Sequence, residues 1–234
     1  MTVSLAIIVP TLNEAGRIGT LLAALTAQFA AADDRPALLV VDGGSHDGTP
    51  ALAAAQGARV IGSEPGRAQQ MNAGAAAAGD VAGLWFLHAD SALPDNALSA
   101  VMAALQGGAA WGRFDVRISG RHWMLPLIAR GMNARSRLTG IATGDQGLFI
   151  SRCAFEAVGG YPIQPLMEDI AITRRLRARM GPPMCLRGPL ITSGRRWERA
   201  GVWRTVALMA WLRWCYWCGA DPARLARHYR PAEH

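Results

Sequence analysis

Lysine is absent from this sequence of 234 residues, so its 24 lysine-or-arginine positions are all arginine. Only 17 acidic residues oppose them, which leaves a formal net charge of +7. The imbalance is greatest after Thr173, where 13 arginines accompany only Glu198, Asp221 and Glu233. This asymmetry indicates an anionic partner such as phosphate, lipid headgroups or nucleic acid, although solvated helix faces explain it equally well.

Cysteine is also scarce. Of the four cysteines only Cys215 and Cys218 are close together, which excludes a disulfide framework. This pair lies in an apolar helical stretch with no strand before it, so packing is favoured over a redox dithiol, and zinc would need further ligands. The apolar run Leu5–Pro10 is too short for a secretory signal peptide. We therefore expect a cytoplasmic protein in a reducing compartment.

No apolar run reaches the length of about 20 residues that a membrane-spanning helix needs. The most apolar stretch, Trp203–Cys218, is shorter and is interrupted by Arg213. It suits either a peripheral contact with the inner membrane, where tryptophan and arginine are common, or packing against the rest of the chain or a second subunit of a homodimer. Arg204 and Arg213 point to opposite sides of a helix, which argues against a single lipid-facing stripe.

The first half of the chain alternates between short apolar runs and segments with helical spacing. The expected strands are Leu5–Pro10, Leu38–Asp42, Arg59–Ile61 and Leu84–His88. The expected helices are Ile18–Phe29, Thr49–Gln56, Ala68–Ala78 and Leu98–Leu105. Such alternation predicts an α/β fold with a mainly parallel central sheet flanked by helices.

The second half is less regular and contains no repeat or long linker. Trp111–Ile118 is expected to form an outer strand, Gly147–Ser151 a short strand and Asp169–Arg179 a basic helix. The simplest organisation is one domain over residues 1–198 followed by a C-terminal helical extension over residues 199–234.

Polar residues follow several of the expected strands. In a parallel sheet, ligands bind at the carboxyl ends of the strands, where Asp42 and Asp90 are both expected. "FLHADS" places His88 and Asp90 two residues apart at a strand end, so both would project to one side and could hold a divalent cation together with a diphosphate. The alternative for "IIVPTLNE", "VVDGGSHDGT" and "FLHADS" is helix capping and turn formation.

Three further groups contain candidate chemistry. The adjacent acids Glu168 and Asp169 open an expected helix, where they could also offset the helix dipole. Asp145 lies between two glycines in "TGDQGLFIS". Arg195 and Arg196, followed by Trp197, could clamp a diphosphate through their guanidinium groups.

These motifs, in this order, resemble those of the family 2 glycosyltransferases, which are inverting enzymes with the GT-A fold. The resemblance covers Ala6 to Trp197 and rests on "IIVPTLNE", "VVDGGSHDGT", "GRAQQMNAGAAAAGD", "FLHADS", "TGDQGLFISR" and "MEDIAITRRLR". "GRAQQMN", "FLHAD" and "RRWERAGVWRT" are also similar to the bacterial subfamily of arsenosugar-biosynthesis glycosyltransferases. The resemblance implies a nucleotide-sugar donor, an acceptor that is small or lipid-linked, and a divalent cation, Mn²⁺ or Mg²⁺.

The resemblance also implies a role for each matching residue. Asp169 corresponds to the catalytic base, with Glu168 in support, and Asp90 to the metal-binding second acid of the DXD motif. Nucleotide-sugar contacts would come from Pro10, Thr11, Asn13, Glu14, Asp42, Arg67, His88, Arg195 and Arg196. The acceptor side would be formed by Gly144, Asp145, Gln146 and Trp197.

One position departs from the family pattern, because His88 stands where DXD has its first acid. Imidazole attracts a cation less strongly than carboxylate does, so metal affinity would be weaker, and His88 could instead bond to ribose or phosphate. The departure leaves open a catalytically inert nucleotide-binding protein of the same fold. A nucleotidyltransferase is less well supported, because the first strand is not followed by the Gly-rich, Arg-containing loop that such enzymes have. Only net charge suggests a nucleic-acid binder, and no nucleic-acid-binding module is recognisable, so we expect none as partner.

Overall fold

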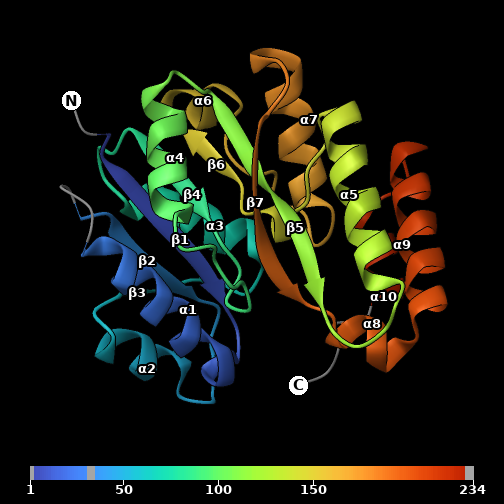
Figure 1. Ribbon diagram of the computed structural model, residues 1–234, viewed down its shortest axis with the longest axis horizontal. Coiled ribbons are helices and arrows are strands. Elements are labelled where there is room, and N and C mark those ends of the chain that lie inside the picture. The colour runs from blue at the N-terminus through green and yellow to red at the C-terminus, as the bar shows by residue number, and fades with distance from the viewer. Residues whose placement is uncertain (1–2, 31–34, 230–234) are drawn as a thin grey trace.

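The computed structural model describes residues 3–30 and 35–229. Its centre is a seven-stranded sheet in the order β3-β2-β1-β4-β6-β5-β7 (Figure 1). β6 runs antiparallel to both of its neighbours, β4 and β5, and the other pairs are parallel. The strands are β1 (Leu5–Thr11), β2 (Ala37–Asp42), β3 (Arg59–Gly62), β4 (Gly83–Phe86), β5 (Trp111–Ser119), β6 (Phe149–Ser151) and β7 (Met184–Ser193).

Both faces of the sheet are covered by helices, and this explains the unbroken apolar runs of the central strands. In β1, Ile7 and Val9 join one core cluster, while Ala6 and Ile8 join a second cluster on the opposite face. The helices are α1 (Ala15–Phe29), α2 (Thr49–Ala55), α3 (Arg67–Ala77), α4 (Ala97–Gln106), α5 (Leu125–Thr139), α6 (Arg152–Ala157) and α7 (Glu168–Met180). A 3₁₀ turn, η1 (Gly144–Gln146), precedes β6.

A glycine lets α3 approach the sheet closely. A Cβ atom added to Gly74 would meet Cγ2 of Ile8 at 2.5 Å and Cγ2 of Val41 at 2.9 Å. Any side chain here would push α3 away from β1 and β2. The beginning of α3, where Arg67 lies, is thereby held near the carboxyl ends of those strands.

The α/β fold with a mainly parallel sheet, predicted from the sequence, is confirmed, but three details differ from the prediction. Trp111–Ile118 is not an outer strand, because β5 lies between β6 and β7. The edge strand on this side of the sheet is β7, which we did not predict, since Gly188 and Pro189 interrupt its apolar pattern. The fourth strand also ends at Phe86, two residues earlier than expected.

Three C-terminal helices complete the structure: α8 (Arg195–Ala200), α9 (Val202–Trp217) and α10 (Pro222–His228). In Figure 1, where they are orange and red, α8 lies just past the ends of β5 and β7, and α9 runs beside α5 at one side of the molecule. Leu212 of α9 and Leu225 of α10 pack against Leu166, Met167 and Ile170 around the start of α7. Within the ranges that the structure describes, no helix is both long enough and apolar enough to cross a membrane.

Candidate active site

The loops after β1 and β2 are joined by reciprocal hydrogen bonds. The Asn13 N–H donates to Oγ of Ser45 at 2.8 Å, and the His46 N–H donates to Oδ1 of Asn13 at 2.9 Å. The Glu14 N–H donates to Oγ1 of Thr49 at 2.8 Å. Asn13 has a φ of 53°, a left-handed conformation that is uncommon outside glycine. The two loops therefore form one rigid unit at the carboxyl edge of the sheet, next to Pro10 and Thr11 at the end of β1.

Asp42 organises this unit from within. Its buried carboxylate accepts hydrogen bonds from the Gly44 and Ser45 N–H groups at 3.0 and 2.8 Å, and from the hydroxyls of Ser45 and Thr11 at 2.5 and 3.3 Å. The turn-forming role that the sequence offered as an alternative is therefore present. Contact with a nucleobase stays a prediction.

Sequence reasoning missed Gln70, which ties the same loops to α3. Its buried amide donates to the carbonyl oxygens of Thr11 and Val41 at 2.7 and 2.8 Å. The available signal was a polar residue within an alanine-rich helix. If such a side chain is buried, it is almost always hydrogen-bonded, so Gln70 could have been expected to bind a neighbouring segment.

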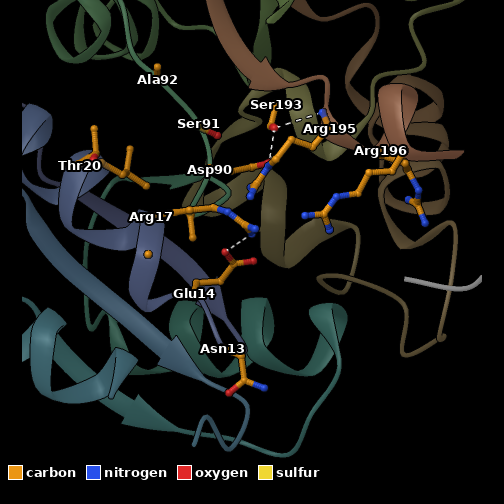
Figure 2. Close-up of a pocket in the computed structure, with 14 residues that line it drawn as sticks. Asn13, Glu14, Arg17, Thr20, Asp90, Ser91, Ala92, Ser193, Arg195 and Arg196 are labelled. Carbon is orange, nitrogen blue, oxygen red and sulfur yellow. Dashed lines mark hydrogen bonds and ion pairs between the residues drawn. The ribbon is translucent and has the colours of Figure 1, made fainter. Parts of the chain in front are cut away.

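A cleft of about 670 Å³ opens beside Asp90, between the β1–α1 loop and the start of α8. Figure 2 shows the guanidinium groups of Arg17 and Arg195 pointing into the same space as the Asp90 carboxylate. Arg196 also lines the cleft, and its guanidinium donates to the hydroxyl of Tyr229 and lies over that ring. Arg17 is also paired with Glu14, at 2.6 Å between Nη1 and Oε2. The lining consists of Asn13, Glu14, Gly16, Arg17, Thr20, Leu21, Ala89, Asp90, Ser91, Ala92, Ser193, Arg195, Arg196 and Arg199.

The structure thus brings the predicted diphosphate clamp, Arg195 and Arg196, to Asp90. It adds Arg17 and Arg199, which sequence reasoning did not select because single arginines in helices carry no distinctive signal. Trp197 is not part of this lining; it packs against Ile118, Leu125 and Ala129. Its predicted contact with an acceptor has no support from this packing.

His88 and Asp90 do not occupy alternating positions of a strand, as we had expected. Because β4 ends at Phe86, both lie in the turn that follows, closed by the Ser91 N–H to the His88 carbonyl oxygen at 3.0 Å. The His88 ring is directed to Asp145, with 4.0 Å between Nδ1 and Oδ1. Burial and the nearby Arg67 lower the pKa of His88, which favours a neutral imidazole.

The predicted acidic pair opens α7. Met167, immediately before it, has a φ of 65°, so the helix starts from a strained residue. Asp169 accepts hydrogen bonds from the Gly144 N–H at 2.9 Å and from its neighbour Ile170 at 2.7 Å. Glu168 is buried. The pair therefore lies against η1, which carries the predicted acceptor residues Gly144 and Asp145.

Gln146, the third of those acceptor residues, is fully buried. Its side-chain oxygen accepts from the Thr143 N–H at 3.2 Å, and its amide donates to the Phe114 carbonyl at 3.5 Å. The side chain therefore supports the turn, and contact of Gln146 with an acceptor stays a prediction.

Both acids of the pair hold their protons more tightly than usual. Burial, with the adjacent Asp169, raises the pKa of Glu168 to about 7. Burial also raises the pKa of Asp169, although the hydrogen bonds from Gly144 and Ile170 and the charge of Arg67 act in the opposite direction. Neither acid lines the cleft beside Asp90. Carboxylates whose pKa values are shifted in this way are typical of acid–base catalysis.

Two further residues next to the acids were not predicted. The pKa of the buried Tyr161 is raised well above its ordinary value by burial and by Asp169 and Glu168. Burial lowers the pKa of Arg135, while the charge of Asp169 opposes that change. Nε and Nη2 of Arg135 are buried without a hydrogen-bond partner.

Arg67, at the start of α3, keeps an exposed side chain. Desolvation disfavours its charge, but the fields of Tyr229, Glu168 and Asp145 are stronger in sum and raise the pKa of the guanidinium. Arg67 therefore supplies a fixed positive charge between the donor-side loops and the acidic pair.

A metal ion would find few protein ligands here. Among residues 3–30 and 35–229, no three or more His, Cys, Asp or Glu side chains are grouped to hold one. Asp90 supplies one carboxylate, which suits Mg²⁺ or Mn²⁺ only if phosphate and water oxygens complete the coordination.

Comparison with known proteins places this geometry in a family. Residues 6–156 match the model of glycosyl transferase family 2. No curated protein matches the sequence.

Solved structures with a similar fold include three enzymes or domains. Glucosyl-3-phosphoglycerate synthase from Mycobacterium tuberculosis, in complex with Mn²⁺, uridine-diphosphate and glucosyl-3-phosphoglycerate, has a TM-score of 0.64 at 19% identity, over 85% of this chain and 75% of that one. Mannosyltransferase PcManGT from Pyrobaculum calidifontis, in complex with GDP-Man and Mn²⁺, has a TM-score of 0.64 at 22% identity, over 82% and 57%. TarS 1-349 from S. aureus has a TM-score of 0.66 at 17% identity, over 82% of this chain and 60% of that one.

This chain thus spans less than two thirds of the last two proteins. At these identities the similarity establishes the fold.

Proposed function

The chain belongs to glycosyl transferase family 2, and we propose that it moves a sugar from a nucleotide-diphosphate-sugar donor to an acceptor hydroxyl, with inversion at the anomeric carbon. The observation that carries this proposal is the cleft in which Asp90 meets the side chains of Arg17, Arg195 and Arg196, beside the Asn13–Glu14 loop. A diphosphate is the part of such a donor that needs this concentration of guanidinium groups.

On the donor side, the rigid unit of the β1 and β2 loops would hold the nucleoside. Asp42 fixes this unit, so its contribution to the nucleotide would be largely through the shape of the loop. Arg67 would lie near the base or the phosphates. The structures with uridine-diphosphate and with GDP-Man support a nucleoside diphosphate donor in this fold, with different bases.

On the acceptor side, Asp169 would act as the general base. It would take the proton from the acceptor hydroxyl as that oxygen forms a bond to the anomeric carbon, and the bond to the diphosphate oxygen breaks with its electron pair. The raised pKa of Asp169 suits this task, because a stronger base removes the proton more readily. Glu168 and Arg67 would influence the pKa of Asp169, and the hydrogen bond from Gly144 would orient its carboxylate.

A divalent cation would be held by Asp90 together with the phosphates of the donor. When bound, it would help to neutralise the negative charge on the departing diphosphate. His88, neutral and directed to Asp145, would contribute less than the acid it replaces. Arg17, Arg195 and Arg196 would neutralise a further part of the negative charge on the diphosphate. Complexes with Mn²⁺ in two proteins of this fold support the cation.

The acceptor would be small or lipid-linked, bound beside Gly144 and Asp145. The finer similarity to the arsenosugar-biosynthesis subfamily rests on "GRAQQMN", "FLHAD" and "RRWERAGVWRT" alone, and no comparison adds to it. Residues 1–198 would form the transferase domain and residues 199–234 its extension, of which residues 230–234 lie outside the described part.

A panel of nucleoside diphosphate sugars tests the proposal. Each is titrated calorimetrically with and without Mn²⁺, and release of the nucleoside diphosphate is followed in the same samples. We expect at least one donor to bind more tightly with Mn²⁺ and to be turned over slowly by water. Absence of binding to every donor would contradict the proposal. Tight binding without turnover, even with an extended range of acceptor alcohols, would favour the inert nucleotide-binding protein that His88 leaves open.

A further inference from the structure

The outer face of α9 is rich in tryptophan. Four tryptophans of this helix are exposed, with exposed fractions of 66% for Trp203, 45% for Trp211, 62% for Trp214 and 70% for Trp217. At 100° per residue they fall within an arc of about 120° on one side of the helix. Trp214 and Trp217 are in contact, with 5.3 Å between ring centroids. We call these four residues the tryptophan face.

The tryptophan face is not needed for the core. The opposite side of α9 already buries Val202, Thr205 and Leu212, with Leu212 packed around the start of α7. Apolar side chains on both sides make the helix look uniformly apolar in sequence. An exposed cluster of large apolar side chains in a folded chain marks a surface that binds something.

Two arginines border this surface. The sequence suggested that Arg204 and Arg213, on opposite sides of the helix, argue against a lipid-facing stripe. In the helix the tryptophans lie between them, and the two arginines fall roughly 20° and 40° outside the edges of the tryptophan arc. Among the described residues, no ion pair involves either arginine. A tryptophan arc bordered by cations is the arrangement of a helix that lies in a membrane interface.

The surrounding charge favours an anionic surface. From Arg195 to Tyr229 the chain has seven arginines and two acids, and α9 itself has no acid. Both acids are engaged by backbone groups: Glu198 accepts from the Arg121 N–H at 2.7 Å, and Asp221 accepts from the Ala223 N–H at 2.9 Å. The field outside α9 is therefore positive.

A second copy of the chain fits this surface less well. A two-fold dimer through α9 would bring each arginine-bordered face against an identical one. Arg204 and Arg213 would then meet like charges, with no acid on either helix to pair with them. Phosphate headgroups supply that missing partner.

We propose that the tryptophan face is a docking surface for a membrane that contains anionic phospholipids, with α9 parallel to the membrane plane. The tryptophans would enter the headgroup region, and Arg204 and Arg213 would bind lipid phosphates at its two edges. Because the inner side of α9 packs at the start of α7, docking would hold the Glu168–Asp169 end of the molecule near the membrane. The docking itself does not depend on the proposed sugar transfer.

Vesicle sedimentation tests the proposal with the full-length protein. The vesicles are phosphatidylcholine alone, or equal parts of phosphatidylcholine and phosphatidylglycerol, at low and at physiological salt. We expect binding to the anionic vesicles that weakens as salt rises. The triple variant Trp203→Ser, Trp214→Ser, Trp217→Ser should bind at least tenfold more weakly. The double variant Arg204→Gln, Arg213→Gln should lose roughly 20- to 30-fold at low salt.

The control variants remove an apolar side chain or two arginines from surfaces far from α9. Leu52→Ala removes an exposed apolar side chain from α2, at the opposite side of the molecule in Figure 1. Arg35→Gln with Arg59→Gln removes the same charge near β2 and β3. Both should bind vesicles like the parent, and thermal melts should show every variant folded.

Three results would overturn the proposal. The first is a parent protein that stays in the supernatant with anionic vesicles at low salt. The second is a triple tryptophan variant that binds as tightly as the parent. The third is light scattering that shows a dimer which the triple variant converts to a monomer, since the tryptophan face would then belong to a second copy.

Discussion

The Asp169 carboxylate accepts a hydrogen bond of 2.9 Å from the backbone N–H of Gly144, a residue 25 positions earlier in the chain. This bond joins the start of α7 to η1. On its other side, Gly144 lies against the His88 ring, where an added Cβ would meet Nε2 at 2.5 Å. Asp169, which we propose as the base, the turn η1 and the His88 ring are thus packed into one contiguous unit.

Asp169→Asn should abolish most turnover while donor binding is kept. The amide oxygen can still accept from Gly144, but the amide cannot take a proton, and loss of a general base typically costs about 10²–10⁴ in rate. Turnover and donor affinity are measured on the same sample. Asp145→Asn is the control and should have the milder effect. If the two variants behave the other way round, Asp145 is the base.

Gly144→Ala should reduce turnover and cost about 1–3 kcal/mol of stability, because the new methyl group must displace the largely buried His88 ring. Gly131→Ala is a matched control, since a Cβ at that helical position meets nothing within 4 Å. It should leave turnover unchanged and raise stability by roughly 0.5–1 kcal/mol. Adding His88→Ala to Gly144→Ala relieves the clash. Turnover that is normal in Gly144→Ala would show that this packing does not matter.

Stability should depend on pH through Glu168. Its pKa is about 7 in the folded protein against an ordinary 4.5, so the folded state binds more protons between these pH values. The free energy of unfolding contributed by this group therefore falls as pH rises from about 4.5 to about 7, by about 3 kcal/mol. Denaturant unfolding of the parent and Glu168→Gln at several pH values should show this difference. Parallel stability curves would contradict it.

Asp42→Ala should loosen the β1–β2 loop unit and weaken nucleotide binding. It leaves the Gly44 and Ser45 N–H groups without their acceptor, a loss of about 1–3 kcal/mol of stability. Asp42→Asn keeps an acceptor oxygen and should lose less. Thermal melts and calorimetry with a nucleoside diphosphate measure the two effects, with the exposed Asp80→Asn as control. An unchanged affinity in Asp42→Ala would remove this residue from the nucleotide site.

Asp90→Ala should abolish the Mn²⁺ dependence of nucleoside diphosphate binding, because the other acid that lines the arginine cleft, Glu14, is already paired with Arg17. Calorimetry with and without Mn²⁺ measures it, and Asp95→Ala, an exposed acid five residues later, should behave like the parent. His88→Asp supplies a second carboxylate and should strengthen the dependence. A response to Mn²⁺ that survives in Asp90→Ala would place the cation elsewhere.

The local pattern of the sequence was sufficient for the first half of the fold. Buried strands such as Leu5–Thr11 and Ala37–Asp42 are continuous apolar runs that end in polar residues, and the helices between them have clear spacing. The end of β2 was readable locally, so Asp42 could be assigned to the carboxyl edge of the sheet, whereas β4 ends two residues before the expected His88. The start of α7 at the acidic pair was equally readable.

What the tertiary structure decided is which distant residues meet. No local pattern predicts that β7 forms the sheet edge, or that Arg17 joins Arg195 beside Asp90. The hydrogen bonds of the Gln146 side chain with Thr143 and Phe114, which support the turn, were likewise not readable from the sequence. The sequence by itself determined the chemical groups and the ends of β1 and β2 that carry some of them. Their pairing, burial and altered pKa values depend on contacts between segments far apart in the chain, and these exist only once the sheet and its helices have packed.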